Sequence, residues 1–107
     1  MKRITHLIVA VFLFTAIGCV TGCVTGPPPI EEWLMAKTAM DAAKAVDAQK
    51  HSPGNWHQAE EAYRRAQILF RDREHPDAKE MFIRARLAAE RAENAARLIR
   101  QKSGEVL

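Results

Sequence analysis

Apolar residues recur at helical spacing through the last part of the chain. From residue 76 to about 102, seven of them alternate in steps of four and three: Ala78, Phe82, Ala85, Ala89, Ala92, Ala96 and Ile99. This spacing returns each side chain to one face of an α-helix, so it predicts a single long helix with a continuous apolar stripe. Acidic Asp77 and Glu80 near its start and basic Arg100 and Lys102 near its end suit the helix dipole.

Two earlier segments carry similar stripes. Residues 53 to about 73 place apolar side chains on one face at Trp56, Ala59, Tyr63, Ala66 and Phe70. Residues 30 to about 50 do so at Met35, Ala39, Ala42 and Val46. Prolines at positions 53 and 76 mark the starts of the last two helices. No segment alternates with the period of a strand, so the predicted fold class is all-α: a three-helix bundle whose last two helices form a long antiparallel hairpin.

Alanine dominates these stripes, so a few large side chains must supply most of the buried apolar area. The residues expected to pack the hairpin are Trp56, Ala59, Tyr63, Phe70, Ala78, Phe82 and Ala85. Trp33, near the start of the first helix, has two interpretations. It packs on the other helices, or it lies against a membrane surface.

The first 22 residues have the pattern of a secretory signal. Lys2 and Arg3 precede an apolar run at residues 7–14, and small residues follow. The sequence Val20-Thr21-Gly22-Cys23 then resembles the lipobox of bacterial lipoproteins. The resemblance implies diacylglyceryl transfer to the Cys23 thiol, cleavage before it and acylation, typically with palmitate, of the new amino terminus. The predicted organisation is a signal peptide at 1–22, a lipidated cysteine and proline-rich tether at 23–29, and a helical domain at 30–107.

Three alternatives to this anchor remain open. Cys19 also follows a small residue and is the second candidate for lipidation. Residues 7–24 lack charge over 18 positions, which reaches the lower limit for an uncleaved membrane-spanning helix, and plain secretion is the third alternative. Val24, rather than Asp, follows Cys23, and in the lipoproteins that the motif resembles this favours the outer membrane. The expected location is therefore the periplasmic face of the outer membrane.

Charge and cysteine content exclude several classes of function. The formal charge of +3 falls almost to neutral without Lys2 and Arg3, since 14 basic and 13 acidic residues remain. A nucleic-acid partner is therefore not expected. Neither predicted lipidation site leaves two thiols in the mature chain, so no disulfide is expected.

No constellation typical of an enzyme or a metal centre is found. His51, His57 and His75 fall at predicted turns or helix ends, where solvated side chains are the simplest interpretation. The adjacent pairs Glu31-Glu32 and Glu60-Glu61 point about 100° apart on a helix, so neither forms an acid/base pair. The protein is expected to be non-catalytic and to need no cofactor. The last helix carries an excess of basic residues, many of them in i,i+4 pairs with glutamate: Glu80–Arg84, Arg86–Glu90 and Glu93–Arg97.

Two family resemblances follow from the helical stripes. The first is to the tetratricopeptide repeat, whose helices match Trp56, Ala59 and Tyr63, and then Ala78, Phe82 and Ala85. The hairpin is longer than a standard repeat and occurs once. The second covers nearly the whole chain and is to small bacterial lipoproteins with an Ala-rich helical domain of unknown function. The residues that carry it are Ser52-Pro53, Trp56, Ala59, Ala78, Ala85, Ala89 and Ala92.

The expected function is that of a lipid-anchored adaptor or structural component of the cell envelope. Its expected partner is an envelope protein or a second copy of the chain. Some relatives in the second family also carry a peptidoglycan-binding domain, so the resemblance implies that the protein lies close to peptidoglycan. Two alternatives stay open. One is a binder of small apolar ligands, with a pocket of about several hundred Å³ between the helices. The other is a coiled coil that assembles through the stripe of the last helix.

Overall fold

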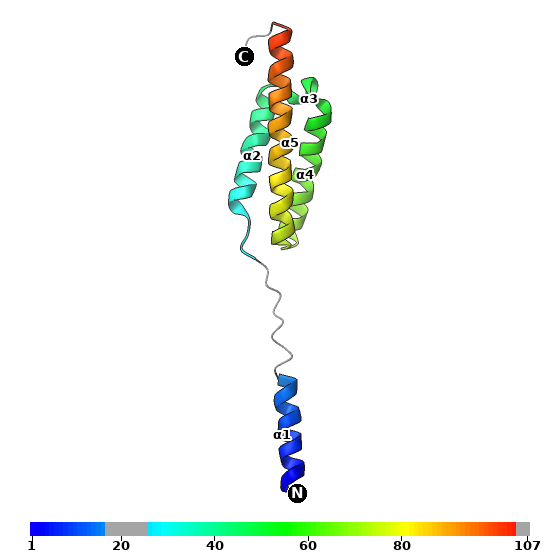
Figure 1. The fold of residues 1–107 in the computed structure, drawn as a ribbon. Coiled ribbons are helices and arrows are strands. Elements are labelled where there is room, and N and C mark those ends of the chain that lie inside the picture. Colours follow the sequence, from blue (N-terminus) through cyan, green and yellow to red (C-terminus); the bar gives the residue numbers. More distant parts are fainter. Residues whose placement is uncertain (17–25, 105–107) are drawn as a thin grey trace.

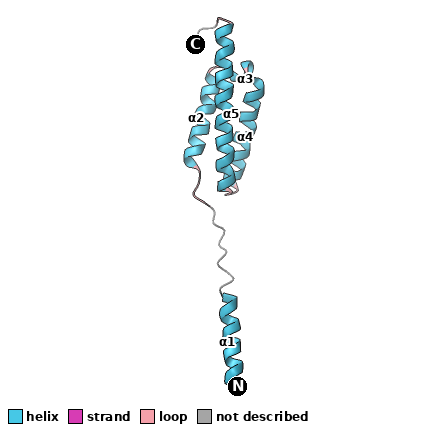
Figure 2. Ribbon diagram, viewed as in Figure 1, coloured by secondary structure: helices cyan, strands magenta, loops and turns pink. Residues whose placement is uncertain are grey.

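The computed structural model describes residues 1–16 and 26–104, and within these residues every regular element is a helix (Figures 1 and 2). The elements are α1 (Lys2–Ala16), α2 (Ile30–Ala45), α3 (Ala48–His51), α4 (Pro53–Arg71) and α5 (His75–Lys102). The all-α class is thus confirmed. Cys19, Cys23 and the lipobox-like sequence lie outside the described residues. Among those described, no helix combines the length and the apolar character needed to cross a bilayer.

Helices α4 and α5 form an antiparallel hairpin, and α2 lies along the other side of α5 (Figure 1). The hairpin turn is short because Arg73 adopts a left-handed conformation, with φ of 60°. The amide of Glu74 donates to the carbonyl of Leu69 at 2.9 Å, which ends α4 as α5 begins. Helix α2 packs mainly on α5 and lies close to α4 at only a few positions. A hollow between α2 and α4 is lined by Lys37, Met40, Asp41, Lys44, Glu60, Tyr63, Arg64 and Gln67.

The predicted stripe of the last helix is the centre of the core. Its buried side chains are Ala78, Phe82, Ala85, Ala88, Ala89, Ala92 and Ala96. Ile99 was expected to belong to the stripe, but it is 43% exposed. The reason is that α5 extends beyond the ends of the helices packed on it (Figure 1). The stripe is covered within the chain by α2, α3 and α4.

The first predicted helix differs from the structure in two ways. It is interrupted, since α2 ends at Ala45 and the one-turn α3 follows after Asp47. Its buried face consists of Ala36, Ala39, Met40 and Ala43, whereas Met35 is 42% exposed. Alanine and methionine occupy both sides of this helix, so spacing alone did not select the buried face.

Asp47 is the residue that permits the break between α2 and α3. Its φ of 56° lies in the left-handed region, which short polar side chains tolerate better than branched ones. We expect Asp47→Val to lower the free energy of unfolding by about 1–2 kcal/mol. Asp47→Gly, the matched control, should leave it unchanged or slightly higher. Urea unfolding followed by circular dichroism measures both, and equal losses in the two variants would contradict this explanation.

The turn before α4 follows the expected Ser-Pro pattern, with one difference. Ser52 occupies the N-cap position, and Pro53 lies in the first turn, where a proline was predicted to mark the start of the helix. The Ser52 hydroxyl does not cap the helix amides, however. It accepts a hydrogen bond of 3.0 Å from the Asn55 side-chain amide, and Ser52 is buried.

Candidate functional site

Four aromatic residues gather where the α4–α5 hairpin meets the start of α2. We call Trp33, Tyr63, Phe70 and Phe82 the aromatic end of the bundle. Phe82 is its centre and is 1% exposed, with ring centroids 5.8 Å from Tyr63 and 6.3 Å from Phe70 in edge-to-face geometry. Such pairs stabilise a core beyond the area that they bury. The aromatic end therefore fixes how three helices meet.

The residues predicted to pack the hairpin divide between two core clusters. Tyr63, Phe70, Ala78, Phe82 and Ala85 belong to the cluster at the aromatic end. Trp56 and Ala59 belong to the cluster at the opposite end, with Ala89 and Ala92. Tyr63 packs against both clusters and so links them.

Trp33 is the residue for which the sequence left two interpretations open. It packs in the aromatic end, and its Nε1 donates a hydrogen bond of 3.1 Å to the Tyr63 hydroxyl. This contact joins residues 30 positions apart. The structure therefore favours the packed interpretation of Trp33 over the membrane-surface one.

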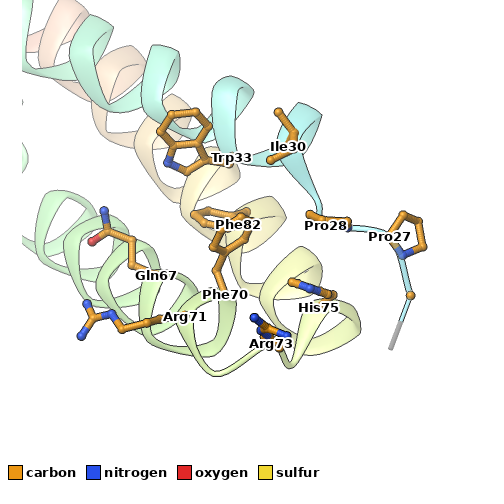
Figure 3. Close-up of a pocket in the computed structure, with 11 residues that line it drawn as sticks. Pro27, Pro28, Ile30, Trp33, Gln67, Phe70, Arg71, Arg73, His75 and Phe82 are labelled. Carbon is orange, nitrogen blue, oxygen red and sulfur yellow. The ribbon is translucent and has the colours of Figure 1, made fainter. Parts of the chain in front are cut away.

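A hollow of about 1050 Å³ opens beside the aromatic end (Figure 3). We call it the end hollow. Its apolar walls are formed by Pro27, Pro28, Ile30, Trp33, Phe70 and Phe82. Its polar lining comes from Gln67, Arg71, Arg73 and His75. The hollow is thus built by the residues before α2, the first turns of α2, the end of α4 and the start of α5.

The polar lining of the end hollow is cationic or neutral. Arg71 and Arg73 are exposed at the hairpin turn, and within the described part of the chain neither makes an ion pair. His75 is half-buried beside Phe70, at 5.6 Å between ring centroids. Its Nδ1 is buried and lacks a hydrogen-bond partner in the described residues. An unpartnered buried nitrogen is uncommon, but this atom is covered by its neighbours and is not exposed to the hollow.

No carboxylate lines the end hollow, although Glu31 and Glu32 line a neighbouring hollow that shares Ile30 and His75 with it. Glu32 contacts Lys79 at 3.2 Å, which ties α2 to α5 beside the hollow rather than in it. A backbone amide and then Lys79 hold the pKa of the Glu32 carboxyl below its ordinary value. Asp72 and Glu74 flank Arg73 in the turn but do not line the hollow. The lining therefore keeps a positive balance.

Ion pairs on the surface of α5 follow the sequence prediction. Glu80 pairs with Arg84, Arg86 with Glu90 at 3.9 Å, and Glu93 with Arg97 at 2.8 Å. These exposed pairs contribute little to stability individually. They do neutralise three of the basic residues that gave α5 its local excess of charge.

The histidines do not converge. His51 and His57 lie near the start of α4, whereas His75 follows its end. In the described ranges, 1–16 and 26–104, no group of three or more His, Cys, Asp or Glu side chains could hold a metal ion.

Comparison with known proteins gives one match. The model of a family described as a domain of unknown function (DUF4398) matches residues 32–104, which is most of the chain. The match covers α3, α4, α5 and nearly all of α2. No curated protein and no solved structure matches the chain. The tetratricopeptide resemblance thus stays a prediction, while the expected domain of unknown function is confirmed.

Proposed function

The chain belongs to the DUF4398 family, whose description assigns no activity, and on that premise we propose that it is a non-catalytic, lipid-anchored protein of the cell envelope. Its location would be the periplasmic face of the outer membrane. There it would act as an adaptor or structural component for an envelope protein or a second copy of itself, within reach of peptidoglycan.

One observation carries this proposal. The lipobox-like sequence ends at Cys23, and the family match begins at residue 32. A cysteine that carries lipid would therefore be joined to the helical domain by a short segment containing three prolines. Two or more acyl chains give stable attachment, since each buried methylene contributes about 0.8 kcal/mol.

Metabolic labelling with an alkyne analogue of palmitate tests the anchor. We expect the full chain to carry the label, Cys23→Ser to lose it and Cys19→Ser to keep it. The reverse pattern would assign the lipid to Cys19 and leave the anchor in place. Mass spectrometry of the native protein that finds an intact initiator end and no acyl adduct would overturn the proposal.

The end hollow favours a second candidate function, the binding of a small apolar ligand. Its volume of about 1050 Å³ lies just above the range of about 300–1,000 Å³ that is usual for ligand pockets, and most of its lining is apolar. This function would be compatible with the anchor, because the hollow and Cys23 involve different residues.

A further inference from the structure

The end hollow has two chemically different sides. Ile30 and Trp33 of α2 form an apolar side, and Phe70 and Phe82 lie between them and the α4–α5 turn (Figure 3). Arg71 and Arg73 lie along the opposite edge, at the end of α4 and in the turn (Figure 3). A ligand that fills the hollow would therefore meet hydrocarbon on one side and guanidinium groups on the other.

The charge of this edge identifies the polar part of such a ligand. Guanidinium groups bind phosphate and carboxylate oxygens through paired hydrogen bonds. Arg71 and Arg73 make no ion pair within the described residues, and no carboxylate lines the hollow. An anionic group is thus the complement of this edge.

The apolar side identifies the rest of the ligand. Ile30 is 49% exposed although it borders a concave surface, and Trp33 and Phe70 are only half-buried. A free anion would leave these side chains in water. A hydrocarbon chain would cover them, and burial of apolar surface is the main source of affinity in such sites.

We propose that the end hollow binds one lipid molecule, with its acyl chain between Trp33, Ile30 and Phe70 and its phosphate on Arg71 and Arg73. The proposal deepens the second candidate function and is independent of the lipid anchor. If the end hollow binds no lipid, the proposed lipid anchor at Cys23 is unaffected, and the reverse also holds.

The two tryptophans provide a direct readout. Trp33 lines the end hollow, whereas Trp56 lies in the core cluster at the opposite end. The full chain, processed as the cell makes it and reconstituted in phosphatidylcholine nanodiscs, should give one indole N–H signal for each. Titration with lauroyl lysophosphatidic acid should shift the Trp33 signal to saturation and leave Trp56 in place.

Two control ligands separate the parts of the proposal. Lauroyl lysophosphatidylcholine carries the same chain, but its phosphate has a single charge that a choline cation offsets. It should bind about tenfold more weakly, because the choline repels the guanidinium groups and the phosphate attracts them less. Glycerol phosphate carries the anion without the chain and should cause no saturable shift. A Trp33 shift of the same affinity with either control would overturn the proposal.

Matched variants test the two sides of the hollow. Arg71→Gln with Arg73→Asn should weaken lysophosphatidic acid about tenfold or more, while Asn still tolerates the left-handed backbone at position 73. Arg65→Gln with Arg91→Gln removes the same charge from exposed positions outside the hollow and should leave affinity unchanged. Equal effects of the two double variants would indicate general electrostatic attraction and overturn the site.

The apolar side has an equally close pair of variants. Ile30→Glu places a carboxylate on the wall of the hollow and should abolish binding. Leu34→Glu changes a residue one turn later that is 51% exposed and outside the lining, so binding should persist. Loss in both variants would point to docking of this end of the bundle on a bilayer surface, and would also overturn the proposal.

Discussion

Replacing Phe82 with alanine will lower the free energy of unfolding by about 3–5 kcal/mol. Phe82 is the largest fully buried side chain of the described residues, at 1% exposure. Its ring meets both Tyr63 and Phe70, so its removal opens a cavity at the point where three helices join. Because small domains are stable by only about 5–15 kcal/mol, this loss would consume much of the total.

Urea unfolding followed by circular dichroism measures the effect of Phe82→Ala. Leu98→Ala is the matched control, since Leu98 lies on the same helix and is 55% exposed. It should change the free energy of unfolding by less than about 0.5 kcal/mol. If Phe82→Ala lowered the free energy of unfolding no more than Leu98→Ala does, the aromatic end would not be the main source of buried apolar area.

The hairpin could be predicted from the sequence because its apolar residues allow only one buried face on each helix. On α5 the stripe from Ala78 to Ala96 is flanked by charged residues, so the spacing determined which side is buried. On α2 the same reasoning failed. Met35 and Ala36 are adjacent, and either could have faced α5. The break at Asp47 was missed because an Asp within a helical pattern is no strong stop signal.

The end hollow could not be predicted, because its sides come from distant parts of the chain. Trp33 precedes Arg71 by nearly 40 residues, and only the packing of α2 against α5 brings them to one place. His75 was expected to be a solvated turn residue, and no role was predicted for Arg73. Asp72 and Glu74 are their sequence neighbours, but Arg73 and His75 line the hollow and the two carboxylates do not.

The second large effect on stability concerns the alanines of α5. Their small side chains let α2 and α4 pack closely on α5. Ala89 is fully buried, in the cluster with Ala39 and Met40 of α2 and Trp56 of α4. We expect Ala89→Leu to lower the free energy of unfolding by about 1–3 kcal/mol or more, since an overpacked side chain forces its neighbours apart. The added methyl and methylene groups would gain about 0.8 kcal/mol each only if space existed for them.

Two further variants distinguish crowding from helix propensity. Ala45→Leu adds the same groups at an exposed position of α2 and should change stability by less than about 0.5 kcal/mol. Ala89→Gly leaves space and should cost about 1 kcal/mol through helix propensity, with about 0.8 kcal/mol more for the lost buried methyl group. Thermal unfolding of the three variants gives the comparison. A more stable Ala89→Leu would mean that the helices leave a gap at this point, and that alanine there is not required for close packing of α2 and α4 on α5.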